Sequence, residues 1–364
     1  MNLFICEQAC RTLPSDGAQS STNFRSDIVL RALLADIRLM DEVRVTIVRD
    51  RRTESGDTLC AHPDHHAGCT VLSLDAGEDD SDSNTEALIN DCINKADVVW
   101  PLAPESNGLL EAISKDVQRH AKILLGCTPQ AIHLSGSKYR TSQALQVADI
   151  AVVPTYRADS VVPPDHGAWV VKPDDGAGCS DTHIFSTLRT AREWIIAQSC
   201  STSLLNMSMA SNYVLQPYLS GRPFSLSLLC GTDEVFLLGC NDQHMVVSDN
   251  QFHYMGCTVN SMKDTCGQLA RLARKVTTAI PGIWGYVGID LVMTEHGPVV
   301  LEVNPRVTMS HGGLHASIGM NPARMLLDVL HRGHCDIRPF SSHRQINVDI
   351  NGGRPRQAAA LSLN

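Results

Sequence analysis

The sequence has no excess of basic residues and no apolar run long enough to span a membrane. Its 30 Lys and Arg residues are outnumbered by 39 Asp and Glu residues, which gives a formal net charge of −9. Nucleic acids and anionic membrane surfaces need a basic face, so we expect neither as the main partner. The start, MNLFICEQAC, lacks the basic and long apolar segments of a signal peptide. We therefore expect a cytoplasmic protein, although local cations can still bind an anionic cofactor.

The sequence also lacks a disulfide framework, an internal repeat and a low-complexity tract. Its thirteen cysteines are an odd number and are scattered along the chain, which favours reduced thiols. One segment, CAHPDHHAGC at residues 60–69, holds soft-metal ligand types, but the usual zinc spacings are not matched. We interpret it as a solvated loop, with a metal site as the alternative.

Short apolar runs alternate with amphipathic stretches in the first third of the chain, which predicts a doubly wound parallel sheet for residues 1–130. The length of 364 residues indicates two or three subdomains. The predicted strands are 3–6, 43–48, 70–74, 97–102 and 122–126, and the predicted helices are 24–38, 85–95 and 109–119.

The pattern changes after Pro129, where strands and helices no longer alternate regularly. We expect α+β subdomains at 131–217 and 218–335, and a tail at 336–364. The predicted strands are 169–173, 213–219, 224–230, 234–240 and a hairpin within 286–303. The predicted helices are 137–147, 188–198, 263–279 and 322–332.

The hairpin GYVGIDLVMTEHGPVVLEVNPR carries the strongest chemical signal. If its pairing is centred on His296, Asp290 lies directly across from Glu302, and Asn304 shares the face of Glu302. Ile289, Leu291, Leu301 and Val303 then form the opposite, apolar face. Opposed carboxylates repel each other, and a magnesium ion between them removes that penalty.

A surface hairpin with solvated acids is the alternative interpretation, but the NPR sequence that follows favours a functional site. Asn304 and Arg306 place an oxygen ligand and a guanidinium at the same end of the strand, which suits a metal and a phosphate together.

Lys172 ends a predicted strand and precedes a loop that contains Gly176 and Gly178. Such a lysine can reach a phosphate group while loop N–H groups wrap it, although a polar turn with an exposed lysine is the alternative. This is not a Walker A loop. Lys138 is a weaker candidate. Further along, the Pro217 carbonyl and the Leu219 N–H could contact the edge of an adenine, with a plain strand connection as the alternative.

The order of these motifs resembles that of the ATP-grasp superfamily over roughly residues 95–332. It runs Lys138, Lys172 with its Gly-rich loop, the QPYLSG hinge, Asp290 and then LEVNPR. The resemblance implies an N-terminal α/β domain followed by an ATP-grasp fold that holds ATP between two α+β subdomains. It implies phosphate contacts from the two lysines, adenine contacts from the hinge backbone, a Mg²⁺ or Mn²⁺ ion on the carboxylates and Asn304, and Arg306 near the transferred group. The residues that the resemblance assigns to the nucleotide are Lys138, Lys172, Gly176, Gly178, Gln216, Pro217, Tyr218 and Leu219.

The resemblance implies an ADP-forming carboxylate–amine ligase that works through an acyl phosphate, with Arg306 and Lys172 as catalytic residues. The sequence departs from the family at Pro223, where many members carry a glutamate that contacts the ribose. ICEQ, PLAPESNGLLEAI and FHYMGC resemble the branch of tyramine–L-glutamate ligases of methanofuran-type cofactor synthesis. The substrates implied are an amino acid and an aromatic amine, with candidate contacts from Asn241, Gln243, Tyr254 and His311.

Three alternatives remain open at this stage. The chain could be a non-catalytic nucleotide-binding protein on the same fold, a phosphotransferase without a second substrate, or a ligase for other amino acids or peptides. A homodimer and a monomer are both compatible with the sequence.

Overall fold

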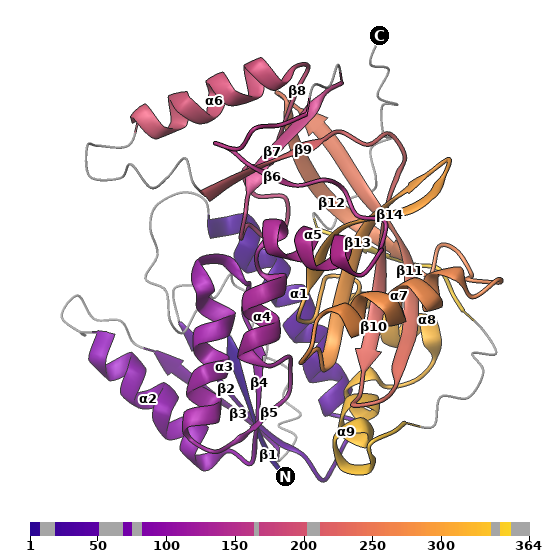
Figure 1. Cartoon of the computed structure of the whole chain (residues 1–364). Coiled ribbons are helices and arrows are strands. Elements are labelled where there is room, and N and C mark those ends of the chain that lie inside the picture. Colours follow the sequence, from indigo (N-terminus) through magenta and orange to yellow (C-terminus); the bar gives the residue numbers. More distant parts are fainter. Residues whose placement is uncertain are drawn as a thin grey trace.

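The computed structural model describes residues 1–7, 19–50, 68–74, 82–163, 167–201, 212–335 and 343–350. Within these ranges the chain forms two sheets with helices packed against them (Figure 1). The cysteine- and histidine-rich segment 60–67 lies outside the described residues, while Cys69 begins a strand. Among the described helices, none combines the length and the apolarity that a membrane span requires.

The N-terminal sheet has five parallel strands in the order β3-β2-β1-β4-β5, which confirms the predicted parallel sheet. The central strand β1 is buried on both faces. Its Phe4 and Cys6 share a core with α2 and α3, whereas Leu3 and Ile5 pack with α1 on the other face. The elements are β1 (Asn2–Glu7), α1 (Gln19–Ile37), β2 (Arg44–Asp50), β3 (Cys69–Leu74), α2 (Asp82–Lys95), β4 (Val98–Leu102), the short 3₁₀ helix η3 (Ser106–Gly108), α3 (Leu109–Arg119) and β5 (Ile123–Leu124).

The second sheet runs in the order β14-β13-β10-β11-β12-β8-β7-β9-β6, with β15 paired to β12 beside this path. All its strand pairs are antiparallel, which is the sheet type of an ATP-grasp region. Its strands are β6 (Tyr156–Arg157), β7 (Trp169–Pro173), β8 (His183–Phe185), β9 (Tyr213–Pro217), β10 (Arg222–Cys230), β11 (Val235–Ser248), β12 (Gln251–Val259), β13 (Gly285–Thr294), β14 (Gly297–Asn304) and β15 (Ile346–Asp349). Its helices are α4 (Pro129–Ser135), α5 (Lys138–Val147), α6 (Leu188–Ser201), α7 (Gln268–Ala279), α8 (His311–Ile318) and α9 (Pro322–Arg332).

Six of these elements, α4, β6, β8, β12, α8 and β15, were not predicted. The sequence does carry a signal for β12, namely the turn-forming pair Asp249 and Asn250. In the structure both residues take positive φ angles and form the tight turn between β11 and β12. A signal for α4 was also present, since Thr128 accepts a hydrogen bond from the Ala131 N–H and Pro129 occupies the first turn. The subdivision of residues 131–364 stays a prediction.

Candidate active site

A cavity of about 1450 Å³ lies between the β13–β14 hairpin, the β7–β9 strands and the end of β4. Every residue that the sequence assigned to the nucleotide or the metal contributes to its wall, and so does Arg306. Residues from positions 29 to 349 therefore meet in one chamber, which is large enough to hold a nucleotide and further substrates together.

The hairpin β13–β14 pairs Asp290 directly with Glu302, as the sequence predicted. The register that produces this pair differs from the prediction near the turn, where Leu291 pairs with Val300. A β-bulge at Leu301 absorbs the one-residue difference. The predicted position of Leu301 on the apolar face is wrong, because the bulge turns this residue to the cavity wall. Val300 and Val303 are buried in the core instead.

The Asp290 carboxylate accepts hydrogen bonds from two side-chain amides. The Gln243 Nε2 donates to Asp290 Oδ1 at 3.0 Å, and the Asn304 Nδ2 donates to Asp290 Oδ2 at 3.2 Å. Burial, together with the charge on Glu302, raises the pKa of Asp290 well above its usual range. Burial also acts to raise the pKa of Glu302, but Lys138 and Lys172 outweigh that effect and lower it. Glu302 is therefore the carboxyl group that stays ionised, and a cation bound to both groups would favour ionisation of Asp290 as well.

The donor set fits a hard divalent cation. Two carboxylates and one amide share a face of the hairpin, and magnesium prefers such oxygen ligands. Among the described residues, no cluster of three or more His, Cys, Asp or Glu side chains forms a candidate metal site. A set of two carboxylates and one amide suits magnesium, which is commonly bound by one or two carboxylates and completes its coordination with substrate phosphates and water.

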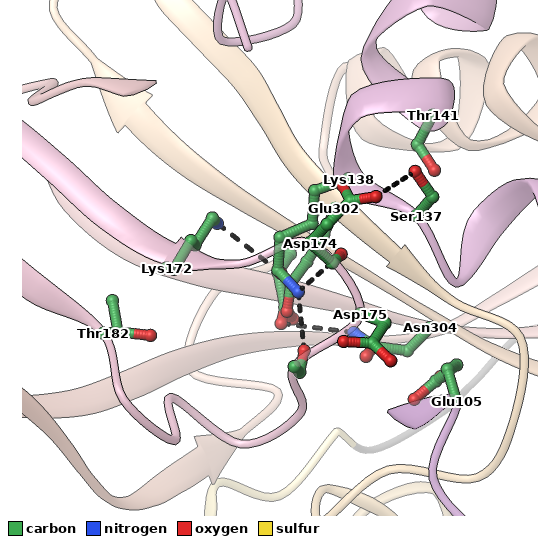
Figure 2. A network of polar contacts seen from close by, with 12 residues as sticks. Glu105, Ser137, Lys138, Thr141, Lys172, Asp174, Asp175, Thr182, Glu302 and Asn304 are labelled. Carbon is green, nitrogen blue, oxygen red and sulfur yellow. Dashed lines mark hydrogen bonds and ion pairs between the residues drawn. The ribbon is translucent and has the colours of Figure 1, made fainter. Parts of the chain in front are cut away.

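Two lysines approach the β13–β14 hairpin from different elements (Figure 2). Lys172 Nζ, at the end of β7, lies 3.5 Å from Glu302 Oε2, and Lys138 Nζ, at the start of α5, lies 3.6 Å from the same oxygen. Both side chains are buried. Burial lowers the pKa of Lys172, while Glu302 acts to raise it. The sequence ranked Lys172 above Lys138, but the structure gives both lysines the same carboxylate partner.

The Gly-rich loop that follows β7 is held in place by the start of α5. Lys138 Nζ donates to the Gly176 carbonyl at 2.6 Å and to the Asp174 carbonyl at 3.3 Å. The Asp174 carboxylate accepts hydrogen bonds from the Ser137 hydroxyl and the Tyr139 N–H. The loop turns through a left-handed Gly178, a conformation that glycine adopts without steric cost. Lys138 therefore orders the loop as well as facing the metal site.

The hinge after β9 presents backbone groups to the cavity. The Tyr218 N–H donates to the Ala168 carbonyl, which makes 168 and 218 a hydrogen-bonded pair. Groups on an antiparallel strand alternate in direction, so the Pro217 carbonyl and the Leu219 N–H point away from β7. This is the acceptor and donor pair that an adenine edge requires. Gln216 is buried and donates to the Thr155 hydroxyl, and Pro223 also lines the cavity.

The four predicted substrate residues separate into two groups. Gln243 and Tyr254 line the cavity. The side chain of Asn241 is fully buried and donates to Ser225 and Ser227 beneath the wall. His311 is buried against the Tyr286 ring and lies 3.7 Å from Asp36. The structure therefore does not support substrate contacts for Asn241 and His311.

Residues 310–315 follow the hairpin directly and could in principle offer backbone N–H groups to a carboxylate. The N–H groups of His311, Gly312 and Gly313 instead donate to the carbonyls of residues 308–310. The side chains of Thr308 and Ser310 line the cavity and bond to each other at 3.0 Å, so this segment offers hydroxyl groups rather than N–H groups. Thr308 and Ser310 were not predicted as site residues, because they lie in the loop between β14 and α8 and the sequence carries no pattern for that loop.

Glu105 was also missed, although it lies in the stretch PLAPESNGLLEAI. Its Oε2 accepts a hydrogen bond from Arg306 Nε at 3.0 Å across 201 positions of sequence. The sequence could not predict this ion pair, since an acidic and a basic residue so far apart in the chain have no local pattern that links them.

Comparison with known proteins identifies the two sequence regions that build this site. Residues 135–310 match the ATP-grasp domain, and residues 43–132 match the pre ATP-grasp 3 domain. A tyramine–L-glutamate ligase from Methanocaldococcus fervens is 25% identical over 240 residues, which is 65% of this chain and 68% of that protein.

Solved structures share the fold at low sequence identity. An ATP-grasp superfamily protein from Archaeoglobus fulgidus matches with a TM-score of 0.64 and 20% identity, over 96% of this chain and 99% of that one. An L-amino acid ligase from Bacillus licheniformis matches with a TM-score of 0.61 and 16% identity, over 90% of this chain and 73% of that one. With the cavity, the opposed carboxylates and the paired lysines, these matches lead to one conclusion: the chain is an ATP-grasp domain protein, with a pre-ATP-grasp domain ahead of its ATP-grasp domain.

Proposed function

We propose that the protein is an ADP-forming ligase that activates a carboxylate as an acyl phosphate and joins it to an amine. The observation that carries this proposal is the convergence of Asp290, Glu302, Lys138, Lys172 and Arg306 on one cavity. Three cationic side chains and a metal-binding carboxylate pair match the charge of a triphosphate that is being transferred.

In this proposal, each group of the site has a defined task. Asp290, Glu302 and Asn304 would hold the magnesium ion, which neutralises phosphate charge when it is bound. Lys172 and Lys138 face the same region and would contact phosphate oxygens. Arg306 would stabilise the phosphoryl group as the substrate carboxylate attacks the γ-phosphorus and ADP leaves. The amine then attacks the acyl carbon, and inorganic phosphate leaves.

The site has to exclude water, because an acyl phosphate would otherwise hydrolyse. The Gly-rich loop 174–182 crosses the phosphate side of the cavity and is tied down by Lys138. We propose this loop as the cover of the reacting groups. No protein nucleophile is required, so none of the cysteines is assigned a catalytic role.

We propose glutamate as the acyl donor and an aromatic amine such as tyramine as the acceptor. The distant similarity to a tyramine–L-glutamate ligase supports this choice. The cavity wall adds a physical argument, since Leu102, Tyr254, Val307 and Met309 form an apolar surface there and belong to one hydrophobic cluster. Such a surface suits an aromatic ring, and the Gln243 amide and the Ser310 hydroxyl provide polar groups on the same wall.

Mass spectrometry of the products tests the proposal. The protein is incubated with ATP, magnesium, glutamate and a panel of aromatic and aliphatic amines, with Glu302→Gln as the control. We expect a glutamyl amide of an aromatic amine and one ADP for each amide. ADP release that needs no acid or amine contradicts the ligase, and coupling of aliphatic amines alone contradicts the acceptor.

A further inference from the structure

The loop between β4 and α3 carries three residues of the N-terminal domain to the edge of the active site. The Glu105 carboxylate binds Arg306. The next residue, Ser106, donates its hydroxyl hydrogen to the Asp175 carbonyl at 2.9 Å, and the Asn107 N–H donates to the Asp175 carboxylate at 2.8 Å. One short segment therefore contacts both the arginine that follows β14 and the Gly-rich loop.

The backbone shape of this segment is specific. Asn107 has φ 57° and Gly108 has φ 66°, two consecutive left-handed residues that turn the chain into α3. Asparagine and glycine tolerate this conformation better than other residues do. Beside the segment, a side chain at Gly136 would approach Glu105 Cβ to 3.3 Å and the Ile132 carbonyl to 2.8 Å. The absence of a side chain there leaves room for the carboxylate.

The pair between Glu105 and Arg306 is largely removed from solvent. The Glu105 side chain is 6% exposed and that of Arg306 is 20% exposed. Glu105 Oε1 is buried and accepts no hydrogen bond from the described residues. Such a pair carries a desolvation cost, so it is weak evidence for a gain in stability. What it does provide is a fixed orientation of the guanidinium.

Arg306 is restrained at two points, which leaves the rest of its guanidinium for other partners. Its Nε donates to Glu105 and its Nη1 donates to the Val307 carbonyl at 3.2 Å. The residue lines the cavity, whereas Glu105 does not. Glu105 can therefore act on a substrate only through Arg306.

We infer that Glu105 is a positioning residue that orients Arg306 toward the transferred phosphoryl group, so that the N-terminal domain is part of the catalytic unit. This inference rests on the proposed function, because it requires Arg306 to contact the reacting groups. It predicts a loss in kcat rather than in ATP affinity, since Arg306 stays present but is held less firmly.

A double-mutant cycle on the full-length protein tests the inference. The variants are Glu105→Ala, the isosteric Glu105→Gln, Arg306→Ala and Glu105→Ala/Arg306→Ala. Glu111→Gln is the control, because Glu111 is an acid of the same domain that pairs with Lys115 and His133 away from the cavity. Amide formation is followed with radiolabelled glutamate, which detects slow turnover, and each variant's Tm is recorded.

We expect Glu105→Ala to lower kcat about 10- to 30-fold, the loss of one charge-assisted hydrogen bond, with KM for ATP changed less than about twofold. Glu105→Gln should lie between that variant and the unmodified protein, because an amide oxygen can still accept from Arg306 Nε. In the Arg306→Ala background, Glu105→Ala should change kcat less than about twofold. A residue that only holds the domains together would cost the same factor in both backgrounds.

Two results overturn the inference. One is an unchanged kcat in Glu105→Gln and Glu105→Ala. The other is an equal loss from Glu105→Ala with and without Arg306. Either result with an impaired Arg306→Ala variant leaves the proposed function intact, whereas full activity of Arg306→Ala contradicts the proposed function itself.

Discussion

The two ends of the cavity differ in how their side chains are brought together. At the metal end, Asp290 and Glu302 belong to one hairpin with a two-residue turn, so neighbouring positions in the sequence determine their meeting. At the proposed substrate end, Tyr254 and Met309 come from a strand and a loop that only the complete fold assembles. Local pairing rules therefore locate the first group, while tertiary structure decides which side chains reach the second.

The largest effect is expected at the metal end. Glu302→Gln removes a metal ligand and the shared partner of both lysines, and Asp290→Asn removes the opposed ligand. Each should lower kcat about 10³-fold, in the range seen when a transition-state contact is lost. The matched control is Glu295→Gln, an exposed acid in the turn of the same hairpin, which should retain full activity. Normal turnover in either ligand variant, or in excess chelator, would remove the metal assignment.

Lys138 and Lys172 come from separate elements but share one carboxylate, that of Glu302. Lys138→Ala and Lys172→Ala should each weaken ATP binding about 10- to 100-fold, which corresponds to a charge-assisted contact of about 1.5–3 kcal/mol. The losses should agree within about threefold, since both Nζ atoms lie at similar distances from Glu302 Oε2. Calorimetric titration measures them, with the exposed Lys95→Ala as the control. A tenfold larger loss for Lys172 would restore the ranking that the sequence suggested.

At the substrate end, exposure to the cavity separates substrate residues from structural ones. Tyr254→Leu removes an aromatic ring from the cavity wall and should raise KM for an aromatic amine about 10-fold, with ATP affinity unchanged. Asn241→Ala removes hydrogen bonds below the wall and should lower Tm by about 4 °C without changing KM. Steady-state kinetics and thermal melts distinguish the two, and the reverse pattern would contradict this division.

The smallest effect concerns His311. Burial lowers the pKa of His311 to about 3, with the neighbouring His315 acting in the same direction. The folded protein therefore keeps this ring neutral, while the unfolded chain binds a proton below about pH 6.5. The stability that this difference contributes is present above pH 6.5 and falls by about 1 kcal/mol between pH 6.5 and 5.5.

The comparison with His311→Gln isolates this contribution. Denaturant unfolding at pH 6.5 and pH 5.5 should show a smaller decline in the variant than in the unmodified protein, because glutamine does not titrate. Equal declines would mean that His311 is protonated in the fold, which its burial against Tyr286 argues against.

The sequence predicted the parallel N-terminal sheet and the opposition of Asp290 and Glu302, because both follow from short-range patterns. It could not predict the bulge at Leu301, which depends on how β14 packs against the core. Asn241 and Gln243 lie two positions apart on β11, yet only Gln243 lines the cavity. Their difference comes from Ser225 and Ser227 on β10, which bind the Asn241 amide beneath the wall. Glu105 could not be assigned at all, because its partner is 201 positions away.

Transfer of ¹⁸O from the acid to phosphate is the most direct test of whether the carboxylate is activated as an acyl phosphate. The protein is incubated with ATP, magnesium, tyramine and glutamate labelled in its carboxylate oxygens, and the released phosphate is analysed by mass spectrometry. We expect each phosphate formed with an amide to carry one ¹⁸O atom, since that oxygen bridges carbon and phosphorus in the acyl phosphate. Amide formation with unlabelled phosphate would contradict activation of the carboxylate by phosphoryl transfer.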